Sequence, residues 1–479
     1  MKMIKYIIIV LSFIVVNSSC KKKELDLFPF NQIETTQAFN TENDANLALN
    51  GMYFGLRASG SYYAGSWNIV GEVASDNVII SVGGRQSQVV YSNWQYNGDN
   101  TLGLFAGGYT MIRRANAIIE NIDKVQGSTP AFINNAKGQA LACRAMVHFD
   151  MARVYGRTPL TITATDNTTI PYITTTDPTT KPSNELVVDV YNKIIADLTT
   201  ANGLISATNP SGRLTKAAVN GLLSRVYLYK GDWPNCIATS IAALGTTPNL
   251  PSIAAFPGIW TDAAGDAGVL FKIKNTLVDN SNTQGTNYSQ TVGGGIRSEY
   301  VVDFALRQLF LATDVRTNTY IQTSPFSGVN QNHVIKYSGK AGFPVGVLDA
   351  KVLRTAEVLL NRAEAYYKNG NEPMALADLN LLKANRITGY VNVTLAGTAL
   401  LDEIFLQRRL EMAFEGDRFW DLKRRNLPVQ RSTFGDRADG TGTTYVFPSL
   451  VAGDYRFNFP IPQGEINFNT NLKQVFGPY

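Results

Sequence analysis

The acidic residues that could carry out hydrolysis occur in two pairs, Glu357 with Glu364 and Glu411 with Glu415. Glycoside hydrolysis uses two carboxyl groups about 5–10 Å apart across the bond that breaks. Both pairs lie on amphipathic helical patterns beside arginines, which is typical of structural ion pairs. We therefore expect no enzymatic activity, and a glycoside hydrolase is the least favoured function.

The sequence lacks other patterns that support catalysis or cofactor binding. Its only histidines are His148 and His333, and no His/Cys group has the spacing of a metal site. There is no G-x-S-x-G elbow, and the glycines at 293–295 lack the Lys-Ser/Thr pair of a phosphate-binding loop. We expect no cofactor and no bound metal, and we expect His148 to pack in the core.

Composition indicates a large globular protein that does not bind nucleic acid. The 479 residues are 44% apolar and 17% charged, with a net charge of +5 and basic runs only at 21–23 and 423–425. They include 22 Tyr, 23 Phe, 5 Trp and 40 Gly. This content fits aromatic-bearing loops that contact a ligand, although most rings in any protein lie in its core.

The most informative stretch is residues 401–425, LLDEIFLQRRLEMAFEGDRFWDLKR. Its apolar residues recur at mostly three- and four-residue spacing, which predicts a helix with one buried face. They are Ile404, Leu406, Leu410, Phe414, Phe419 and Leu422. Charged residues lie between them, mostly three or four residues from an opposite charge, and Gly416 interrupts the pattern. We interpret the stretch as a scaffold element whose charges form a network.

The run RRLEMAFEGDRFWDLKR closely resembles the C-terminal motif of the SusD/RagB family, the surface nutrient-binding lipoproteins of Bacteroidetes. Gln407 stands where this family usually has Glu. Residues 459–479, FPIPQGEINFNTNLKQVFGPY, resemble the family's closing segment and depart from it at Val475-Phe476, where Asn-Pro is usual. The likeness runs nearly from end to end.

Residues 1–19 predict a lipoprotein signal peptide. A basic start precedes an apolar stretch at 6–16, and Asn-Ser-Ser precedes Cys20. Eleven residues at ~1.5 Å each cannot cross a ~30 Å hydrocarbon core, so the segment is not a membrane span. The small residues before Cys20 resemble a bacterial lipobox, which implies acylation of Cys20, with palmitate for example, and a tether over 20–34. The alternative is an ordinary secretory signal with an incidental cysteine.

Several segments have the period of amphipathic helices. We predict helices over 44–56, 104–125, 133–155 and 187–205, the last with Ser183 and Asn184 as possible caps. Two stretches share tetratricopeptide periodicity, with small and aromatic residues at equivalent positions. These are Ser224, Tyr227, Gly231, Cys236, Ser240 and Ala243, and then Ala363, Tyr366, Gly370, Ala375, Leu379 and Leu382. Cys143 and Cys236 fall within helical patterns, where buried free thiols are favoured over a single bridge.

We predict a mostly α fold in one SusD-like domain over 35–479. Tetratricopeptide-like helix pairs near 104–155, 187–244 and 351–385 stack together, followed by the family segment at 401–479; the family resemblance implies the same arrangement. Segments 62–101, 161–182, 250–297 and 320–348 are too long for plain connections, so we expect irregular loops that form a ligand-binding face. Residues 269–273 and 333–337 are candidate short strands.

Residues 62–97 have the composition of a glycan platform, where rings stack on sugar faces and polar groups bind hydroxyls. Glycan-binding family members place an Asp, an Arg and a Trp-x-x-Asn in this early loop, and the matching positions are Asp76, Arg85, Trp94 and Asn97. Further candidates are Tyr96, Tyr288 and Tyr320. Trp67 and Tyr91 are the rings most expected to be core instead.

The resemblance implies a lipoprotein anchored at the surface of the outer membrane. It would bind an oligosaccharide and deliver it to a SusC-like TonB-dependent transporter, with the helical face away from the binding loops in contact with that barrel. A peptide-binding protein like RagB is the main alternative, and a scaffold without a ligand of its own is another.

Overall fold

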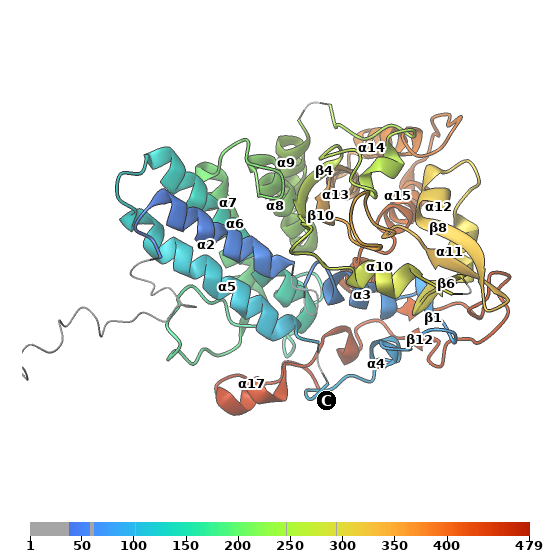
Figure 1. Cartoon of the computed structure of the whole chain (residues 1–479), viewed down its shortest axis with the longest axis horizontal. Coiled ribbons are helices and arrows are strands. Elements are labelled where there is room, and N and C mark those ends of the chain that lie inside the picture. Colours follow the sequence, from blue (N-terminus) through green and yellow to red (C-terminus); the bar gives the residue numbers. More distant parts are fainter. Residues whose placement is uncertain (1–37, 58–61, 101, 246, 294) are drawn as a thin grey trace, which may run out of the picture.

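The computed structural model describes residues 38–57, 62–100, 102–245, 247–293 and 295–479, and this part of the chain is mostly helical, as predicted (Figure 1). Long helices of the first half of the chain fill the left of Figure 1, and the small sheets lie on the right among shorter helices and long connections. The predicted signal peptide, the tether and Cys20 lie outside the described residues. No helix within the described ranges is long and apolar enough to span a bilayer.

The helices predicted from periodicity all form, with ends that differ by a few residues. They are α2 (Glu42–Leu56), α5 (Leu104–Asn121) with the short η2 (Ile122–Lys124), α6 (Pro130–Tyr155) and α7 (Val187–Leu204). α5 packs on α2 and α6, and α6 packs on α7. Thr129 caps α6 by accepting a hydrogen bond from the backbone N–H of Phe132, with Pro130 at the first helical position.

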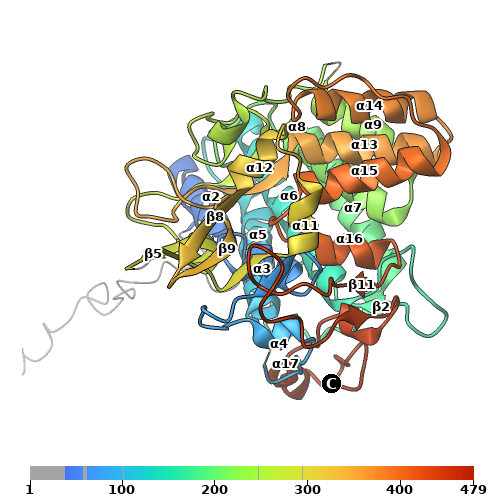
Figure 2. The same ribbon diagram turned by 90° about the vertical axis from the view of Figure 1, so that its right-hand side faces the viewer.

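The predicted tetratricopeptide-like pairs are α8 (Lys216–Lys230) with α9 (Trp233–Leu244), and α13 (Thr355–Lys368) with α14 (Glu372–Ala384). Gly231 and Gly370 adopt φ of 76° and 79° in the two turns, a conformation that favours glycine. α13 packs between α9, α14 and α15 (Gly397–Glu411), so the second pair stacks on the first (Figure 2). This prediction is confirmed.

The predicted caps of α7 are wrong. The helix begins after Leu186, and no side chain caps it. Residues 185–186 form β3 (Glu185–Leu186), which pairs with β2 (Thr168–Thr169) and keeps the backbone extended up to the helix. The Asn184 side chain instead donates to the Thr169 carbonyl oxygen at 3.0 Å and accepts from the Lys473 backbone N–H at 2.8 Å.

The segment 62–101 is not the surface loop that its composition suggested. It contains α3 (Ser66–Val73), every residue of which is buried, then β1 (Val78–Ile80) and the short α4 (Val89–Ser92). β1 pairs with β7 (Tyr300–Val302). Trp67 and Tyr91 are buried, as expected. Much of the segment 62–101 therefore lies inside the molecule.

The middle of the chain supplies short helices and four-stranded and two-stranded sheets. Its elements are η3 (Phe256–Ile259), β4 (Val269–Ile273), α10 (Thr283–Ser289), β5 (Gln290–Val292), β6 (Gly295–Arg297), α11 (Phe304–Leu309), α12 (Val315–Tyr320), β8 (Ile321–Phe326), β9 (Val329–Val334) and β10 (Ala350–Arg354). The sheet order is β5-β6-β8-β9, and β4 pairs with β10. The predicted strand at 269–273 is confirmed as β4. The predicted strand at 333–337 overlaps only the last two residues of β9, because the chain leaves the sheet there.

The 401–425 stretch forms two helices rather than one, α15 and α16 (Arg418–Arg424), separated at 412–417. Gly416 has a φ of 83°, and its carbonyl oxygen would lie 2.0 Å from a Cβ placed on Gly71 of α3. The break therefore lets the motif approach α3 closely. The chain ends with β11 (Val429–Gln430), β12 (Ser449–Leu450), η4 (Tyr455–Phe457) and α17 (Gln463–Phe468).

One large hydrophobic cluster contains side chains from Phe39 to Leu472, so both ends of the described chain contribute to the same core. Cys143 and Cys236 are buried and free, as expected. Burial raises the pKa of the Cys143 thiol to about 12, so this thiol stays protonated and unreactive at neutral pH.

Candidate functional site

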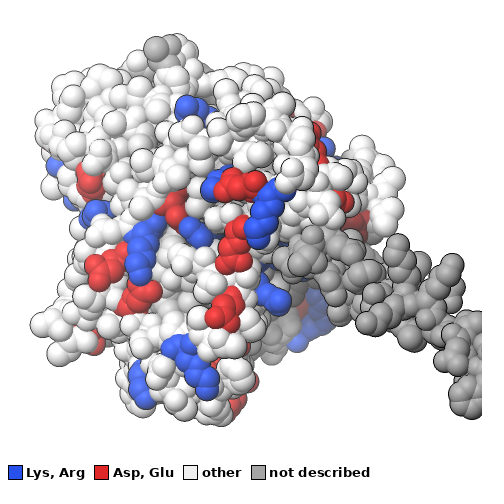
Figure 3. Space-filling view, turned by 90° about the vertical axis from the view of Figure 1, so that its left-hand side faces the viewer, with Lys and Arg blue, Asp and Glu red and all other residues white. Residues whose placement is uncertain are grey.

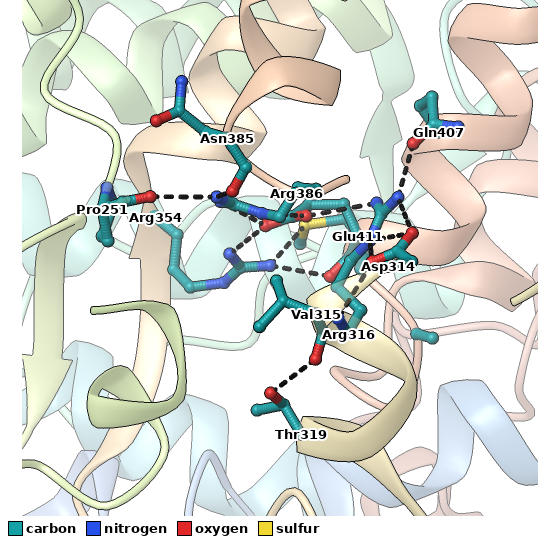
Figure 4. A network of polar contacts seen from close by, with 12 residues as sticks. Pro251, Asp314, Val315, Arg316, Thr319, Arg354, Asn385, Arg386, Gln407 and Glu411 are labelled. Carbon is teal, nitrogen blue, oxygen red and sulfur yellow. Dashed lines mark hydrogen bonds and ion pairs between the residues drawn. The ribbon is translucent and has the colours of Figure 1, made fainter. Parts of the chain in front are cut away.

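The charges of the 401–425 stretch meet partners from three other segments around Glu411 (Figure 4). The Glu411 carboxylate lies 2.7 Å from Arg354 Nη1, 2.9 Å from Arg386 Nε and 3.3 Å from Arg316 Nη1. We call these four residues the charged hub. All four are at most 1% exposed. Burial disfavours a charged carboxylate, but the three guanidinium groups hold the pKa of Glu411 well below its usual range.

The remaining carboxylates considered for hydrolysis are also buried and paired. Glu357 accepts a hydrogen bond from Arg225 at 2.7 Å, and Glu364 accepts two from Arg424 at 2.7 Å each. Glu415 binds Arg354 of the charged hub. These contacts confirm the interpretation of the pairs as structural ion pairs.

Asp76, predicted to bind a sugar, is an internal partner of the same stretch. It is 6% exposed, and its carboxylate lies 2.8 Å from Arg418 Nε and 3.1 Å from Arg409 Nη2. Burial alone would raise the pKa of Asp76, but the two arginines lower it to about 2. The structure therefore assigns Asp76 to an interior ion pair.

Trp94 lies just after α4 and is 3% exposed, and its ring contacts other parts of the protein. Its indole Nε1 donates to the Ala74 carbonyl oxygen at 2.9 Å, and the Arg431 guanidinium lies 4.0 Å from the ring centroid. Its backbone φ is 52°, in the left-handed region that is uncommon for residues other than glycine. The ring face that would stack on a sugar is occupied by an arginine.

The three predicted tyrosines are interior as well, with 4% exposure for Tyr96 and 0% for Tyr288 and Tyr320. The Tyr96 hydroxyl donates to the Arg456 carbonyl oxygen, and the Tyr320 hydroxyl donates to the Glu411 carbonyl oxygen. Rings enclosed in this way cannot contact a ligand in solvent. Asp76, Trp94 and these tyrosines thus have packing roles here, contrary to their expected exposure on loops.

Arg85 and Asn97 are the two predicted contacts that reach solvent. The Arg85 side chain is 44% exposed, although its Nε lies 2.8 Å from Glu299 Oε1. Asn97 lies on an exposed turn, and its Oδ1 accepts from the backbone N–H groups of residues 99 and 100. The next residue, Gly98, accepts a hydrogen bond from the backbone N–H of Gln463 at 2.9 Å, so this turn adjoins the start of α17.

A groove of about 460 Å³ lies between α5, residues 171–182 and the region of α17 up to residue 472. We call it the α5–α17 groove; Figure 1 shows α17 below α5. Rings of α5 and α17 contribute apolar surface, and three prolines and several threonines come from residues 171–182. Volumes of about 300–1,000 Å³ are typical of small-molecule sites. The groove is built from segments that sequence analysis treated separately.

His148 anchors one wall of this groove from the core. It is 0% exposed and stacks on Tyr172 with a centroid distance of 3.8 Å. Its Nε2 accepts from the Ile173 backbone N–H at 3.0 Å, so its Nδ1–H donates to the Arg144 carbonyl oxygen at 2.9 Å. Burial lowers the pKa of His148 to about 3, and the ring is neutral at physiological pH. The predicted core role of His148 is confirmed.

Two charged side chains that line the groove lack a partner. Neither Arg113 of α5 nor Glu465 of α17 makes a side-chain hydrogen bond or ion pair with any of the described residues. Sequence analysis missed both. The available signal was that Phe105, Tyr109 and Arg113 follow one another at four-residue steps on α5, so a charge extends the row of rings.

Among the described residues, the outer surface of the helical side shows no large region of one charge. Figure 3 shows basic and acidic side chains interspersed over the face on the left of Figure 1. Several form ion pairs, such as Lys137 with Asp123 at 2.6 Å. A long polyanion binds where positive charge is concentrated, and this face does not concentrate it.

Comparisons with known proteins agree with the fold and the motif. A family model described as "Starch-binding associating with outer membrane" matches residues 25–228, and the model of the SusD family matches residues 272–478. SusD-like protein P2 of Formosa agariphila is 26% identical, over 98% of this chain and 99% of that protein. A SusD-like protein of Bacteroides ovatus is 26% identical, over 72% of this chain and 71% of that protein.

Solved structures share the architecture along most of the chain. A crystal structure of a SusD superfamily protein from Bacteroides thetaiotaomicron superposes with a TM-score of 0.79 at 26% identity, covering 91% of this chain and 100% of that chain. The C-terminal motif, the stacked helix pairs and the two family matches point to one conclusion. The chain belongs to the SusD/RagB family.

Proposed function

We propose that this protein binds a glycan at the cell surface and delivers it to a SusC-like TonB-dependent transporter of the outer membrane. Acyl chains on Cys20 anchor it to that membrane, since two or more chains give stable attachment. The protein acts as a binding partner and not as an enzyme.

The observation that carries this proposal is the match of residues 25–228 to a family described as starch-binding and associated with the outer membrane. The contacts of the carboxylates support a role without catalysis. Every carboxylate considered for hydrolysis is engaged by buried cations, so none is placed to donate a proton to a leaving group.

Arg85 and Asn97 remain proposed ligand contacts, because their side chains reach solvent. The transporter contact is proposed for the helical side, away from the long connections. Mixed charge on that side suits a protein partner, which needs complementary charges of both signs.

Affinity electrophoresis tests the glycan role. The soluble chain starting after Cys20 is run through native gels that contain starch, xylan, mannan, alginate or carrageenan. Retardation by at least one polysaccharide is expected. Migration unchanged in every gel would refute the glycan proposal, and binding of a peptide library instead would support the RagB-like alternative.

Two further measurements test the anchor and the partner. Cys20→Ser should move the protein from the membrane fraction to the soluble fraction, because no acyl chain can then be attached. The full-length protein should co-purify with the transporter when both are expressed together. A Cys20→Ser chain that stays in the outer membrane would contradict the anchor.

A further inference from the structure

We infer that the α5–α17 groove binds a segment of an uncharged oligosaccharide. This inference rests on the proposed function and adds to it the place of binding and the class of sugar. It depends on four features of the groove. These are an exposed aromatic ring, unpaired charges, hydroxyl groups that can still accept hydrogen bonds, and backbone N–H and C=O groups that already have hydrogen-bond partners.

The exposed ring is Phe468, at the end of α17. Its side chain lines the groove and is 72% exposed, and Lys181 Nζ lies 5.7 Å from the ring centroid. In the α5 wall, Tyr109 is half-buried, and Phe105, which is 3% exposed, packs against it with ring centroids 4.9 Å apart. Flat CH faces of sugar rings stack on such aromatic surface, so the groove offers apolar contact at its rim and along its wall.

The unpaired charges are Arg113 and Glu465. The Arg113 side chain is exposed and Glu465 is partly buried, and neither has a side-chain partner in the described part of the chain. Glu465 is close enough to Tyr109 to contribute to the raised pKa of that hydroxyl, after burial and other neighbours. A guanidinium has five N–H donors and a carboxylate only acceptors, so together they can bind hydroxyls in both roles.

Three of the four threonine hydroxyls that line the groove donate their protons within the protein, and the fourth, on Thr175, accepts from the Asp177 backbone N–H. Thr110 donates to the Ala106 carbonyl oxygen at 2.8 Å, and Thr176 donates to the Glu120 carboxylate at 2.5 Å. Thr180 donates in the same way, to a backbone carbonyl of its own loop. Their oxygens keep free lone pairs, so the wall can accept hydrogen bonds from a ligand rich in hydroxyl donors.

The same segment is poorly suited to an extended peptide. A peptide that adds as a strand needs free N–H and C=O groups along an edge. Here Pro171, Pro178 and Pro182 have no N–H. The carbonyl oxygens of 171, 173, 175 and 182 accept from side chains of α5 and the α17 region, and the N–H groups of 172, 173 and 176 donate to side chains. A sugar, which binds through side chains, fits better.

The balance of charge favours a neutral sugar. The charged lining residues are Arg113, Asp177 and Glu465, one positive and two negative. Thr179 donates its backbone N–H and its hydroxyl to Asp177, and these hydrogen bonds lower the pKa of that carboxyl. With Lys181 beside Phe468 at the rim, the charges balance at two positive and two negative, so a sulfated or uronic-acid chain would gain no net attraction.

The test uses Phe468→Ala and Arg113→Ala in gels that contain the neutral polysaccharide that retards the wild type most. Loss of one aromatic contact or one charge-assisted hydrogen bond should weaken retardation about 3- to 10-fold. The matched control is Phe54→Ala, because Phe54 is 52% exposed on α2 with Arg57 4.6 Å from its ring, and it lies outside the groove. All three side chains are exposed, and thermal unfolding confirms that each variant is folded.

The inference is supported if the polysaccharide retards both groove variants less than the wild type and retards Phe54→Ala as much as the wild type. Raising the salt concentration from 50 to 300 mM should also leave the retardation of the wild type unchanged, as expected for an uncharged ligand. Normal retardation of both groove variants would overturn this inference and leave the glycan role intact. Retardation by alginate or carrageenan alone would overturn the uncharged class. Groove variants that bind glycan normally but no longer co-purify with the transporter would make the groove a protein contact instead.

A wild-type protein that no polysaccharide retards would overturn both the proposed function and this inference. That result differs from failure of the inference alone, in which the wild type is retarded and the groove variants are retarded equally.

Discussion

The charged hub and the α5–α17 groove contain the same residue types in opposite circumstances. In the hub, Glu411 and its three arginines are at most 1% exposed, and each carboxylate oxygen has a cation beside it. In the groove, Arg113 and Glu465 are near solvent and have no side-chain partner among the described residues. The charges of the hub are used by the fold, whereas the two unpaired charges of the groove are free to bind a ligand.

The largest loss of stability should come from removing the carboxylate of the charged hub. Glu411→Ala leaves three buried guanidinium groups without their shared partner, so we expect a loss of about 3–5 kcal/mol in the free energy of unfolding. Glu465→Ala is the matched change in the groove and should alter stability by about 0.5 kcal/mol or less. Urea denaturation of the soluble chain measures both. Equal losses in the two variants would show that the distinction between the regions is wrong.

A second pair of variants compares two aromatic rings. Trp94→Ala removes a buried ring with an arginine stacked on it and should cost about 3–5 kcal/mol, whereas Phe468→Ala should cost less than about 0.5 kcal/mol. Retardation by the glycan, corrected for the folded fraction, should fall more in Phe468→Ala than in Trp94→Ala. If folded Trp94→Ala lost all retardation at unchanged stability, Trp94 would be a ligand contact after all.

The dependence of stability on pH separates two other buried groups. The pKa of His148 is about 3 in the folded state, below its usual value near 6.5, so its contribution is complete above pH 6.5 and is lost as pH falls. Burial raises the pKa of Glu72 to about 7, so the folded state gains stability relative to the unfolded state as pH falls from 7 to about 4.5. The two effects oppose each other in the wild type.

Single variants reveal each effect. Between pH 6.5 and 5, the wild type should lose about 1.6 kcal/mol relative to His148→Gln, because the slope rises from half to nearly all of its limit of about 1.4 kcal/mol per pH unit. Glu72→Gln should shift the profile in the opposite direction over the same range. Urea denaturation at four pH values measures the slopes. Parallel profiles for the wild type and His148→Gln would show that His148 already titrates normally in the folded protein.

The smallest change in stability is expected at Gln407, where this chain departs from the family motif. Gln407 Oε1 accepts from Arg316 Nη2 at 2.7 Å, and its Nε2 donates to Glu403 at 3.1 Å. Gln407→Glu strengthens the first contact and replaces the second with repulsion, so the net change should stay within about 1 kcal/mol. Thermal unfolding tests this. A loss above about 2 kcal/mol would mean that the hub cannot hold another negative charge.

The sequence predicted the helical framework because periodicity and turn glycines are local. α5, α6 and α7 form where apolar spacing placed them, and Gly231 and Gly370 turn the repeat pairs. The spacing of the charges in residues 401–425 also predicted that they would be structural. The helices and turns depend on residues within about one helix pair, which a single sequence contains in full, whereas the partners of Glu411 lie on distant segments.

Most of the predicted ligand platform is buried rather than exposed, for the converse reason. Residues 62–97 have the composition of a binding loop, but α3 and the following turn are covered by a segment more than 300 positions away. Asp76 meets Arg418, and Trp67 stacks near Trp420 with centroids 6.3 Å apart. Composition does not show which polar or aromatic residue a distant segment will cover. The α5–α17 groove was missed on the same ground, because its walls come from three separate parts of the chain.

The charged hub also constrains the order in which the protein can become native. Arg316, Arg354 and Arg386 are synthesised before Glu411, the carboxylate that they share. Until residue 411 is available, these cations cannot be buried without a large penalty, and a chain that stops earlier keeps them exposed to water. Completion of the interior is therefore tied to completion of the polypeptide, so incomplete chains should remain open to proteases while full-length chains close.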